Sequence, residues 1–318
     1  MSAPAAIGID VGGTRLRAAT ITGDGRIVER RRGVTPAHDG EALLRAIRDI
    51  ADELGPDLPI GVGIAGLVAG DGTVTYGPNI GIRDLPLATR LRDLGDVTVA
   101  VANDASVAAL AEQRTGAGRG NDDVLLVTLG TGIGGGVVAG GRLLSGAHGF
   151  AGEVGHVVVE AGGRPCACGN LGCVEAYASG SAIGLAARRA LAEGTGPSTL
   201  RDVEDVDGQA VTRAAAAGDE LARDVLAECG RWLGIALASV SNVLDPELVL
   251  IGGGAAAGTA EWVLPAARIS LAGHLVGAPG RRPPAVELAG LGDDAGVVGA
   301  GLIAIDAASG ADTHGRVR

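Results

Sequence analysis

Three of the four cysteines in the chain fall within residues 166–173, and their types and spacing could bind a metal. Cys166, Cys168 and Cys173 form the pattern C-x-C-x4-C, and His156 precedes the first of them by ten residues. Three thiolates and one imidazole are a complete ligand set for a closed tetrahedral zinc site. A disulfide fits poorly because three thiols cannot all pair, and simple core packing fits poorly because CACGNLGC is a glycine-rich loop. We therefore predict a structural Zn²⁺ site at these four residues.

Two glutamates flank this cluster. Glu153 lies three residues before the histidine, and Glu175 lies two residues after the last cysteine. An isolated glutamate is usually a solvated surface residue, but a metal-bound loop would hold these two in fixed positions. A zinc ion with four protein ligands has no open position for a substrate. We therefore expect the zinc to be structural and the carboxylates to contact the substrate.

Composition narrows the class of protein. A chain of 318 residues is long for one core and favours two packed domains, and 47% hydrophobic residues exclude global disorder. A formal charge of -11 argues against a nucleic-acid or anionic-membrane partner. The first residues do not resemble a signal peptide, and no run of eighteen apolar residues follows. We expect a soluble, cytoplasmic protein whose reduced thiols can bind zinc.

The first strands of the chain carry a motif for phosphate. Residues 6–32 are predicted to form three strands joined by glycine turns, and Asp10-Val-Gly-Gly-Thr14 follows the first strand. A Walker loop needs a lysine at the start of a helix, and this chain has no lysine. Gly12 and Gly13 permit close backbone approach, Thr14 can donate a hydrogen bond, and Asp10 can hold Mg²⁺ through water. The alternative is a plain hairpin without a ligand.

A strand, Asn103-Asp104 and a helix follow one another in residues 97–114. The pattern predicts Asp104 at the N-cap of the helix, and capping is one complete explanation for it. The functional alternative is a general base. The positive end of the helix dipole favours the carboxylate form, so we expect this group to be charged.

Two further glycine turns follow later in the chain. Gly130, Gly132 and Gly135 match G-x-G-x-x-G, but the next segment, VVAGGRLL, reads as a strand and not as the helix of a dinucleotide-binding fold. We therefore predict a second hairpin of the type strand, Gly/Thr turn, strand, with Thr128 and Thr131 as hydroxyl donors. The strand ELVLIGGG ends in Gly252-Gly253-Gly254, which either faces a nucleoside or only turns tightly into a helix.

The remaining patterns are helical or polar. Helices are predicted at 41–54, from Ser179 to 194, at 218–243 ending at Asp245-Pro246, and in the stretch GDDAGVVGAGLIAID near the C-terminus. Cys229 is expected to be a small core residue. Residues 193–210 are predicted to be a polar loop without chemistry.

Taken in order, DVGGT at 10–14, ND at 103–104, TLGTGIGGG at 128–136, GEVGH at 152–156, CACGNLGCVE at 166–175 and LVLIGGG at 248–254 resemble the ROK family over nearly the whole chain. The resemblance implies an α/β fold of the actin-like ATPase (ribonuclease H-like) type. It implies two domains around a cleft, with a zinc knuckle in the second and the C-terminal helix returning to the first. The domains would be 1–115 plus about 291–310 and 116–290, and 311–318 would be a disordered tail.

The resemblance also implies roles for single residues. Asp104 would be the catalytic base, and the substrate would contact Gly66, Asn103, Asp104, Glu153, His156 and Glu175. The nucleotide and its magnesium would lie along Asp10, Gly12, Gly13, Thr14, Arg15, Thr131, Gly132, Gly253 and Gly254. Arg15 stands where many family members have lysine, and it keeps the positive charge with a different shape. Gly63-Ile64-Ala65-Gly66 lacks the proline that is usual in this loop.

The family includes sugar kinases and sugar-sensing repressors. The kinase members imply a hexokinase-type enzyme that transfers the γ-phosphate of ATP to the 6-hydroxyl of glucose, with Mg²⁺. Another hexose or N-acetylhexosamine (N-acetylmannosamine, N-acetylglucosamine, fructose or mannose) is the alternative, and polyphosphate is an alternative donor. A non-catalytic sugar-sensing regulator is disfavoured by Asp104, and a repressor is disfavoured by the short segment before Asp10 and by the acidic charge. The expected partners are a small-molecule sugar, a nucleotide and further copies of the chain, as a dimer or tetramer. His156 could bind zinc through one ring nitrogen and a sugar hydroxyl through the other.

Overall fold

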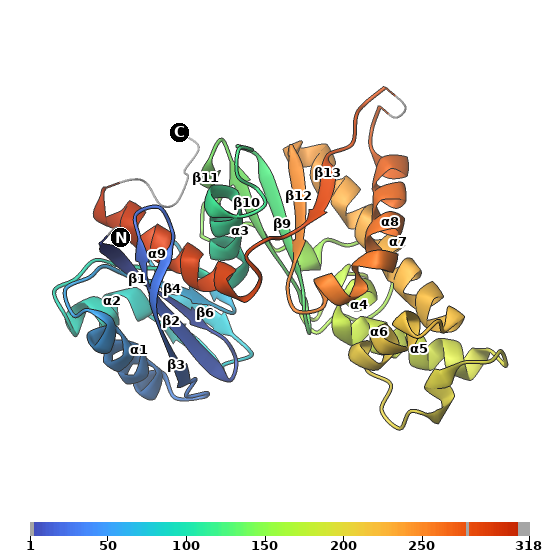
Figure 1. Ribbon diagram of the computed structural model, residues 1–318, viewed down its shortest axis with the longest axis horizontal. Coiled ribbons are helices and arrows are strands. Elements are labelled where there is room, and N and C mark those ends of the chain that lie inside the picture. Colours follow the sequence, from blue (N-terminus) through green and yellow to red (C-terminus); the bar gives the residue numbers. More distant parts are fainter. Residues whose placement is uncertain (1–2, 278–279, 311–318) are drawn as a thin grey trace. The chain divides into compact units, whose positions relative to one another are not determined.

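The structure is a computed structural model, and it describes residues 3–277 and 280–310 (Figure 1). By its contacts the chain divides into two compact units. The first contains the chain up to Leu126, Gly136–Gly152 and the chain from Ala289 on, and the second contains Val127–Gly135 and Glu153–Leu288. Segments 116–126 and 136–152 thus belong with the first unit by contact, whereas the predicted limits assigned them to the second domain; those limits stay a prediction. The predicted tail, 311–318, lies outside the described residues.

The first unit is built on a five-stranded sheet with the order β3-β2-β1-β4-β8. The first three strands form the predicted antiparallel meander, whereas β4 and β8 run parallel to β1. Val11 pairs with Ile64, which pairs with Asn103, so the carboxyl ends of three parallel strands meet at one edge of the sheet. This edge brings together the residues that follow each strand. The strands are β1 (Pro4–Val11), β2 (Arg15–Thr22), β3 (Ile27–Val34), β4 (Ile60–Ile64) and β8 (Val99–Asn103).

Helices cover both faces of this sheet. Ile7, Ile9 and Val11 pack in a core with α1 and α2, and Ala6 on the opposite face packs in a second core with α3 and α9. The C-terminal helix α9 lies against β1 and β4, as the resemblance implied (Figure 1). The helices are α1 (Gly40–Leu54), α2 (Leu87–Asp93), α3 (Asp104–Thr115) and α9 (Ala295–Ala308), and a small antiparallel sheet contains β5 (Leu67–Val68), β6 (Val74–Gly77) and β7 (Ile82–Leu85).

A second five-stranded sheet has the order β11-β10-β9-β12-β13. Its strands β9 and β10 confirm the second predicted hairpin, since no helix follows Gly132. β9, β10 and β12 were expected as strands. β11 was included in the predicted second strand, VVAGGRLL, and β13, which is parallel to β12, was not expected. The strands are β9 (Val124–Leu129), β10 (Ile133–Ala139), β11 (Arg142–Leu143), β12 (Leu248–Gly252) and β13 (Ala285–Leu288).

The helices of the second unit agree with the sequence patterns in part. The helix that starts at Ser179 and the long helix that ends at Asp245 are confirmed, and Cys229 is buried in the latter. The predicted loop at 193–210 is wrong in part, because it contains a short 3-10 helix and the first turn of α6. Asp207 begins that helix by accepting a hydrogen bond from the backbone N–H of Ala210. The elements are η1 (Val154–His156), α4 (Glu175–Ala178), α5 (Gly180–Glu193), η2 (Thr199–Asp202), α6 (Gly208–Ala216), α7 (Glu220–Leu244) and α8 (Ala256–His274).

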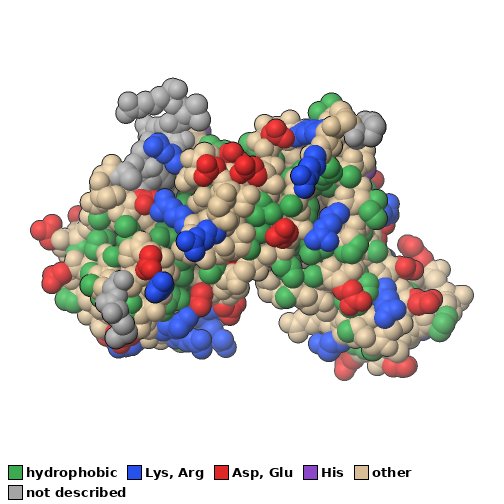
Figure 2. Space-filling model, turned by 45° about the horizontal axis from the view of Figure 1, so that its top comes forward, with side chains coloured by type: hydrophobic (Ala, Val, Ile, Leu, Met, Phe, Trp, Pro, Cys, Tyr) green, Lys and Arg blue, Asp and Glu red, His purple; other side chains and the backbone are tan. Residues whose placement is uncertain are grey.

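Charged side chains of both signs lie on the surface (Figure 2). Figure 2 shows acidic and basic side chains close to one another over much of the face that it displays. Among the described helices, none has the length and apolar character needed to cross a bilayer.

Candidate functional site

The three cysteines and the histidine converge as predicted. The ligand atoms of His156, Cys166, Cys168 and Cys173 all lie within 4.8 Å of one another. The Sγ atoms of Cys168 and Cys173 are 3.7 Å apart, and Cys166 Sγ is 3.8 Å from His156 Nδ1. A tetrahedral ion with Zn–S bonds of about 2.3 Å separates its sulfur ligands by about 3.8 Å, so the spacing fits Zn²⁺. We call these four residues the Cys–His cluster.

The chemistry of the thiols also favours a cation in the Cys–His cluster. Burial raises the pKa of Cys166 to about 12, and hydrogen bonds with Cys168 and Cys173 add to this effect. Burial also raises the pKa of Cys173, so these two thiols resist ionisation by themselves. A bound divalent cation reverses this preference, because it stabilises the thiolates that coordinate it.

The two predicted carboxylates lie beside this cluster. Glu153 Oε2 is 3.8 Å from His156 Nε2, so one ring nitrogen of the histidine faces the thiols and the other faces this carboxylate. Glu175 Oε2 accepts a hydrogen bond of 2.9 Å from the backbone N–H of Ile133. The second unit therefore brings Glu153, His156 and Glu175 together, as predicted, and joins them to the glycine turn between β9 and β10.

In the first unit, the prediction that Asp104 caps helix α3 is wrong by one residue. Asn103 is the N-cap, and its Oδ1 accepts from the backbone N–H of Ser106 at 3.0 Å. Asp104 is the first helical residue, and its Oδ1 accepts from the N–H of Ala105 at 2.8 Å. The Nδ2 group of Asn103 donates to the carbonyl of Gly66 at 3.1 Å, which brings the predicted Gly66 to the same place. Strand β8 extends through Asn103, and the helix starts directly after it, one residue earlier than expected.

The electrostatics of this edge also differ from the expectation. Burial raises the pKa of Asp104, and the hydrogen bond from the Ala105 N–H offsets this only in part. The helix start therefore does not keep the carboxylate at ordinary acidity. Burial and the charge of Asp104 raise the pKa of Asp10 to about 6, against the opposing effect of the Arg17 guanidinium at 3.9 Å. Raised pKa values make both carboxylates better proton acceptors than surface aspartates.

Two hydrogen bonds to backbone carbonyl groups hold the turn after β1. The N–H of Gly12 donates to the carbonyl of Arg15 at 3.1 Å, and the hydroxyl of Thr35 donates to the carbonyl of Gly12 at 2.7 Å. Thr14 and Arg15 are exposed at its tip. The turn therefore presents a hydroxyl, a guanidinium and backbone groups outward, as a phosphate contact requires.

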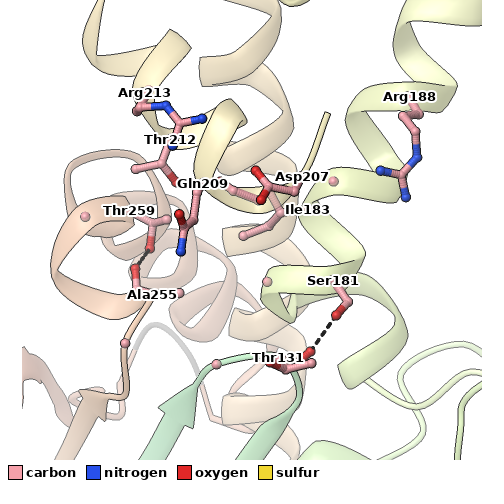
Figure 3. A pocket seen from close by; sticks show the side chains of 16 residues that line it. Thr131, Ser181, Ile183, Arg188, Asp207, Gln209, Thr212, Arg213, Ala255 and Thr259 are labelled. Atoms are coloured by element: carbon pink, nitrogen blue, oxygen red, sulfur yellow. Dashed lines mark hydrogen bonds between the residues drawn. The ribbon is translucent and has the colours of Figure 1, made fainter. Parts of the chain in front are cut away.

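The second unit contains a pocket of about 840 Å³ (Figure 3). Gly130 and Thr131 of the β9–β10 turn and Gly254 and Ala255 before α8 line one end of it. Gly253 does not line it. This residue has φ +87, and a Cβ there would lie 2.4 Å from the Leu129 carbonyl, so it serves the tight turn into α8. The tight-turn interpretation of the glycine triplet therefore holds for Gly253, and the interpretation in which the triplet faces a nucleoside stays a prediction.

The opposite walls of the pocket come from helices α5 and α6, and sequence reasoning missed them. The side chains of the missed polar residues surround the cavity in Figure 3. No local motif marks them, because they meet only where α5 packs on α6. The N-cap Asp207 was the one available signal, since it indicates a helix start in a stretch read as loop. The missed residues are Ser181, Arg188, Asp207, Gln209, Thr212 and Arg213.

Comparisons with known proteins agree with these features. A family model described as "ROK family" matches residues 6–307. The chain belongs to the ROK family. It is 38% identical over 317 residues to a glucokinase of Halalkalibacterium halodurans, covering 93% of this chain and 94% of that protein. It is 34% identical to an N-acetylmannosamine kinase of Escherichia fergusonii, covering 94% and 97%.

A solved ROK structure extends this likeness to three dimensions. The crystal structure of a ROK family glucokinase from Streptomyces griseus in complex with glucose and AMPPNP superposes with a TM-score of 0.77 at 38% identity, covering 93% of this chain and 97% of that one. The predicted ROK membership and the predicted actin-like α/β fold are thereby confirmed.

Proposed function

We propose that this ROK protein is a glucokinase that transfers the γ-phosphate of ATP to the 6-hydroxyl of glucose. The observation that carries the proposal is Asp104, a half-buried carboxylate at the start of α3 whose pKa is raised by desolvation. A relative named glucokinase at 38% identity supports glucose, and the solved relative that binds glucose and AMPPNP supports ATP as the donor.

Asp104 would act as the general base. In its ionised form it would accept the proton of the sugar hydroxyl as that oxygen attacks the γ-phosphate. Phosphoryl transfer passes through a loose transition state that needs positioning more than a strong base, so an aspartate suffices. Asn103 would orient the same sugar, and its tie to the Gly66 carbonyl would hold the neighbouring loop.

The sugar contacts from the second unit would be Glu153, His156 and Glu175. Carboxylates and an imidazole suit a polyol because each can accept from, or donate to, neighbouring hydroxyls at fixed angles. The 3.8 Å approach of Glu153 Oε2 to His156 Nε2 supports a shared role at that ring nitrogen. Zn²⁺ in the Cys–His cluster would be structural, because four protein ligands leave it no open position.

The nucleotide would occupy the pocket of the second unit, with its phosphates toward Thr131 and Gly254 and the nearby Gly132 and Gly253. In the first unit the turn from Gly12 to Arg15 would contact the phosphates. Mg²⁺ would be held through Asp10 and would neutralise charge on the phosphates.

Asp104→Asn tests the function directly. The amide keeps the size of the side chain and cannot accept the proton, so kcat for glucose phosphorylation is expected to fall by about 10² to 10⁴-fold. Nucleotide affinity and the melting temperature serve as controls and should not decrease. Full glucose phosphorylation by this variant would refute the assignment of the base.

N-acetylmannosamine phosphorylation is the second candidate function, and the 34% identity to a kinase of that name favours it. A purified-protein panel separates the two: glucose, mannose, fructose, N-acetylglucosamine and N-acetylmannosamine, each with ATP and with polyphosphate. The highest kcat/KM is expected for glucose with ATP. A higher value for N-acetylmannosamine would overturn the choice of sugar but not the kinase assignment.

The enzyme would work as a homo-oligomer, a dimer or tetramer, in the cytoplasm at the entry to glycolysis. Val243 at the end of α7, Ile269 in α8 and Val276 just after it are 81%, 76% and 69% exposed, and apolar residues at such exposure suit a subunit interface. Light scattering coupled to size exclusion measures the mass; a monomer would refute this part.

A further inference from the structure

Glu175 lies between the Cys–His cluster and the turn at residues 130–133. We propose that Glu175 is a positioning residue that holds this turn in the shape that binds nucleotide, and that the Cys–His cluster holds Glu175 in place. The inference rests on the proposed function, in which the adjoining pocket binds the nucleotide. It adds a role in nucleotide binding to a carboxylate otherwise assigned to the sugar.

The contact between Glu175 and the turn is direct. Oε2 accepts a 2.9 Å hydrogen bond from the Ile133 N–H, and a backbone amide bonded to a carboxylate forms a charge-assisted bond. Gly132 leaves the space that the carboxylate occupies, because a Cβ at this position would lie 2.4 Å from Oε2. An alanine at 132 would therefore require the carboxylate to move away from this position.

Neutral hydrogen bonds hold the other side of the same turn. The Gly180 N–H donates to the Gly130 carbonyl at 2.8 Å, and the Ser181 hydroxyl donates to the Thr131 carbonyl at 2.9 Å. Glu175 adds a hydrogen bond from a charged side chain to these contacts. Gly130 and Thr131 line the pocket, so displacement of the Ile133 amide would move the pocket wall (Figure 3).

The backbone of Glu175 and its second carboxylate oxygen lie next to the Cys–His cluster. The glutamate starts α4 two residues after Cys173, which is fully buried. The intervening Val174 donates its N–H to the Val157 carbonyl, next to His156, at 2.9 Å. Oε1 of Glu175 is 3.6 Å from Cys166 Sγ. Ordering of the cluster by a metal would thus order the segment that carries the carboxylate.

Nucleotide binding measured by calorimetry without sugar tests the proposal. Glu175→Ala should bind AMPPNP about tenfold more weakly than the natural protein. Glu175→Gln should stay within about threefold, because an amide oxygen still accepts from the Ile133 N–H. The matched control Glu153→Gln alters the other carboxylate that lies beside the Cys–His cluster. It should weaken glucose binding while AMPPNP binding stays unchanged. Melting temperature and zinc content check that the variants remain folded and metal-loaded.

The possible results separate the two proposals. If Glu175→Ala binds AMPPNP normally and loses only glucose affinity, the positioning role is wrong and the glucokinase proposal stands. If the natural protein binds no nucleotide, the proposed function itself fails. Removal of the metal by chelation should weaken AMPPNP binding in the natural protein more than in Glu175→Ala, and equal weakening would refute the link to the cluster.

A double-mutant cycle tests whether Gly132 and Glu175 act together. Gly132→Ala should weaken AMPPNP binding, because the added methyl group meets the carboxylate oxygen. In the Glu175→Ala background the same change should cause little further loss, since the obstructing oxygen is gone. Additive losses would show that the glycine acts independently, and would overturn the coupling.

Discussion

Asp10 lies near the end of β1 and Asp104 directly follows β8 in the same sheet, and the charge of Asp104 makes Asp10 harder to ionise. Burial is the largest cause of the raised pKa of both carboxyl groups. A catalytic base must be basic enough to accept a proton from the substrate, and a raised pKa makes a carboxylate more basic. The pKa of a carboxylate that binds a metal ion can be raised in the same way while no cation is bound. At the residue scale, ionisation of these two carboxyl groups therefore lowers the stability of the folded chain.

Asp10→Asn measures the loss of stability that the ionised Asp10 carboxylate causes. The pKa of Asp10 rises from 3.8 to about 6 on folding, so between these values the native state binds more protons than the unfolded chain, and its stability falls as pH rises. Asparagine is neutral at every pH. The variant should be more stable than the natural protein by about 3 kcal/mol at pH 7, and nearly equal to it below about pH 3. Urea unfolding at the two pH values tests this; a variant that is less stable at pH 7 would contradict it.

His156 joins the metal and the proposed sugar site through its two ring nitrogens. Nδ1 is 3.8 Å from Cys166 Sγ, whereas Nε2 is 3.8 Å from Glu153 Oε2. His156→Ala should therefore lower the zinc content and weaken glucose binding together, each by about tenfold or more. Elemental analysis and calorimetry measure the two effects, with the exposed His148→Ala as control. Loss of one property without the other would contradict the double role.

At the element scale, helices and hairpins that depend on residues close together in the sequence could be predicted. Alternating apolar residues and glycine turns identified the two hairpins, and helical spacing identified α1 and α7, because these signals depend on neighbouring residues. The start of α3 was misplaced because Asn103 and Asp104 are both good caps, and strand pairing of Asn103 with Ile64 decides between them. The α5–α6 wall of the pocket could not be predicted, since packing between helices brings its residues together.

Asn103 combines a helix cap with a place in the proposed sugar site. Asn103→Ala removes the bond to the Ser106 N–H and the bond to the Gly66 carbonyl, so stability should fall by about 1–2 kcal/mol and glucose binding should weaken. Ser179→Ala is the matched control, because Ser179 caps α5 through Ala182. It should lower stability by about 1 kcal/mol without weakening glucose binding. Equal glucose affinity for both variants would limit Asn103 to capping.

At the scale of the whole chain, the first unit is completed only by its C-terminal segment. The buried carboxylate of Glu112 accepts hydrogen bonds from the backbone N–H groups of Ala117, Gly290 and Leu291, at 2.9, 3.0 and 2.7 Å. It thereby anchors the returning chain to the end of α3, just before α9. This return was expected from the family resemblance. Its anchor was not, because a single buried glutamate has no distinctive sequence pattern.

The close packing of α9 on the sheet gives a last prediction about the whole first unit. A Cβ at Gly61 in β4 would lie 1.7 Å from the Ala300 carbonyl of α9, so a methyl group there must separate the helix from the sheet. Gly61→Ala should therefore lower the free energy of unfolding by about 2 kcal/mol or more. Gly23→Ala, in the turn between β2 and β3, is the control, because its Cβ would meet nothing within 4 Å, and its effect should stay within about 0.5 kcal/mol. Urea unfolding compares the three proteins. Equal stability of the two variants would mean that α9 does not complete the first unit in solution, and that the two ends of the chain fold independently of each other.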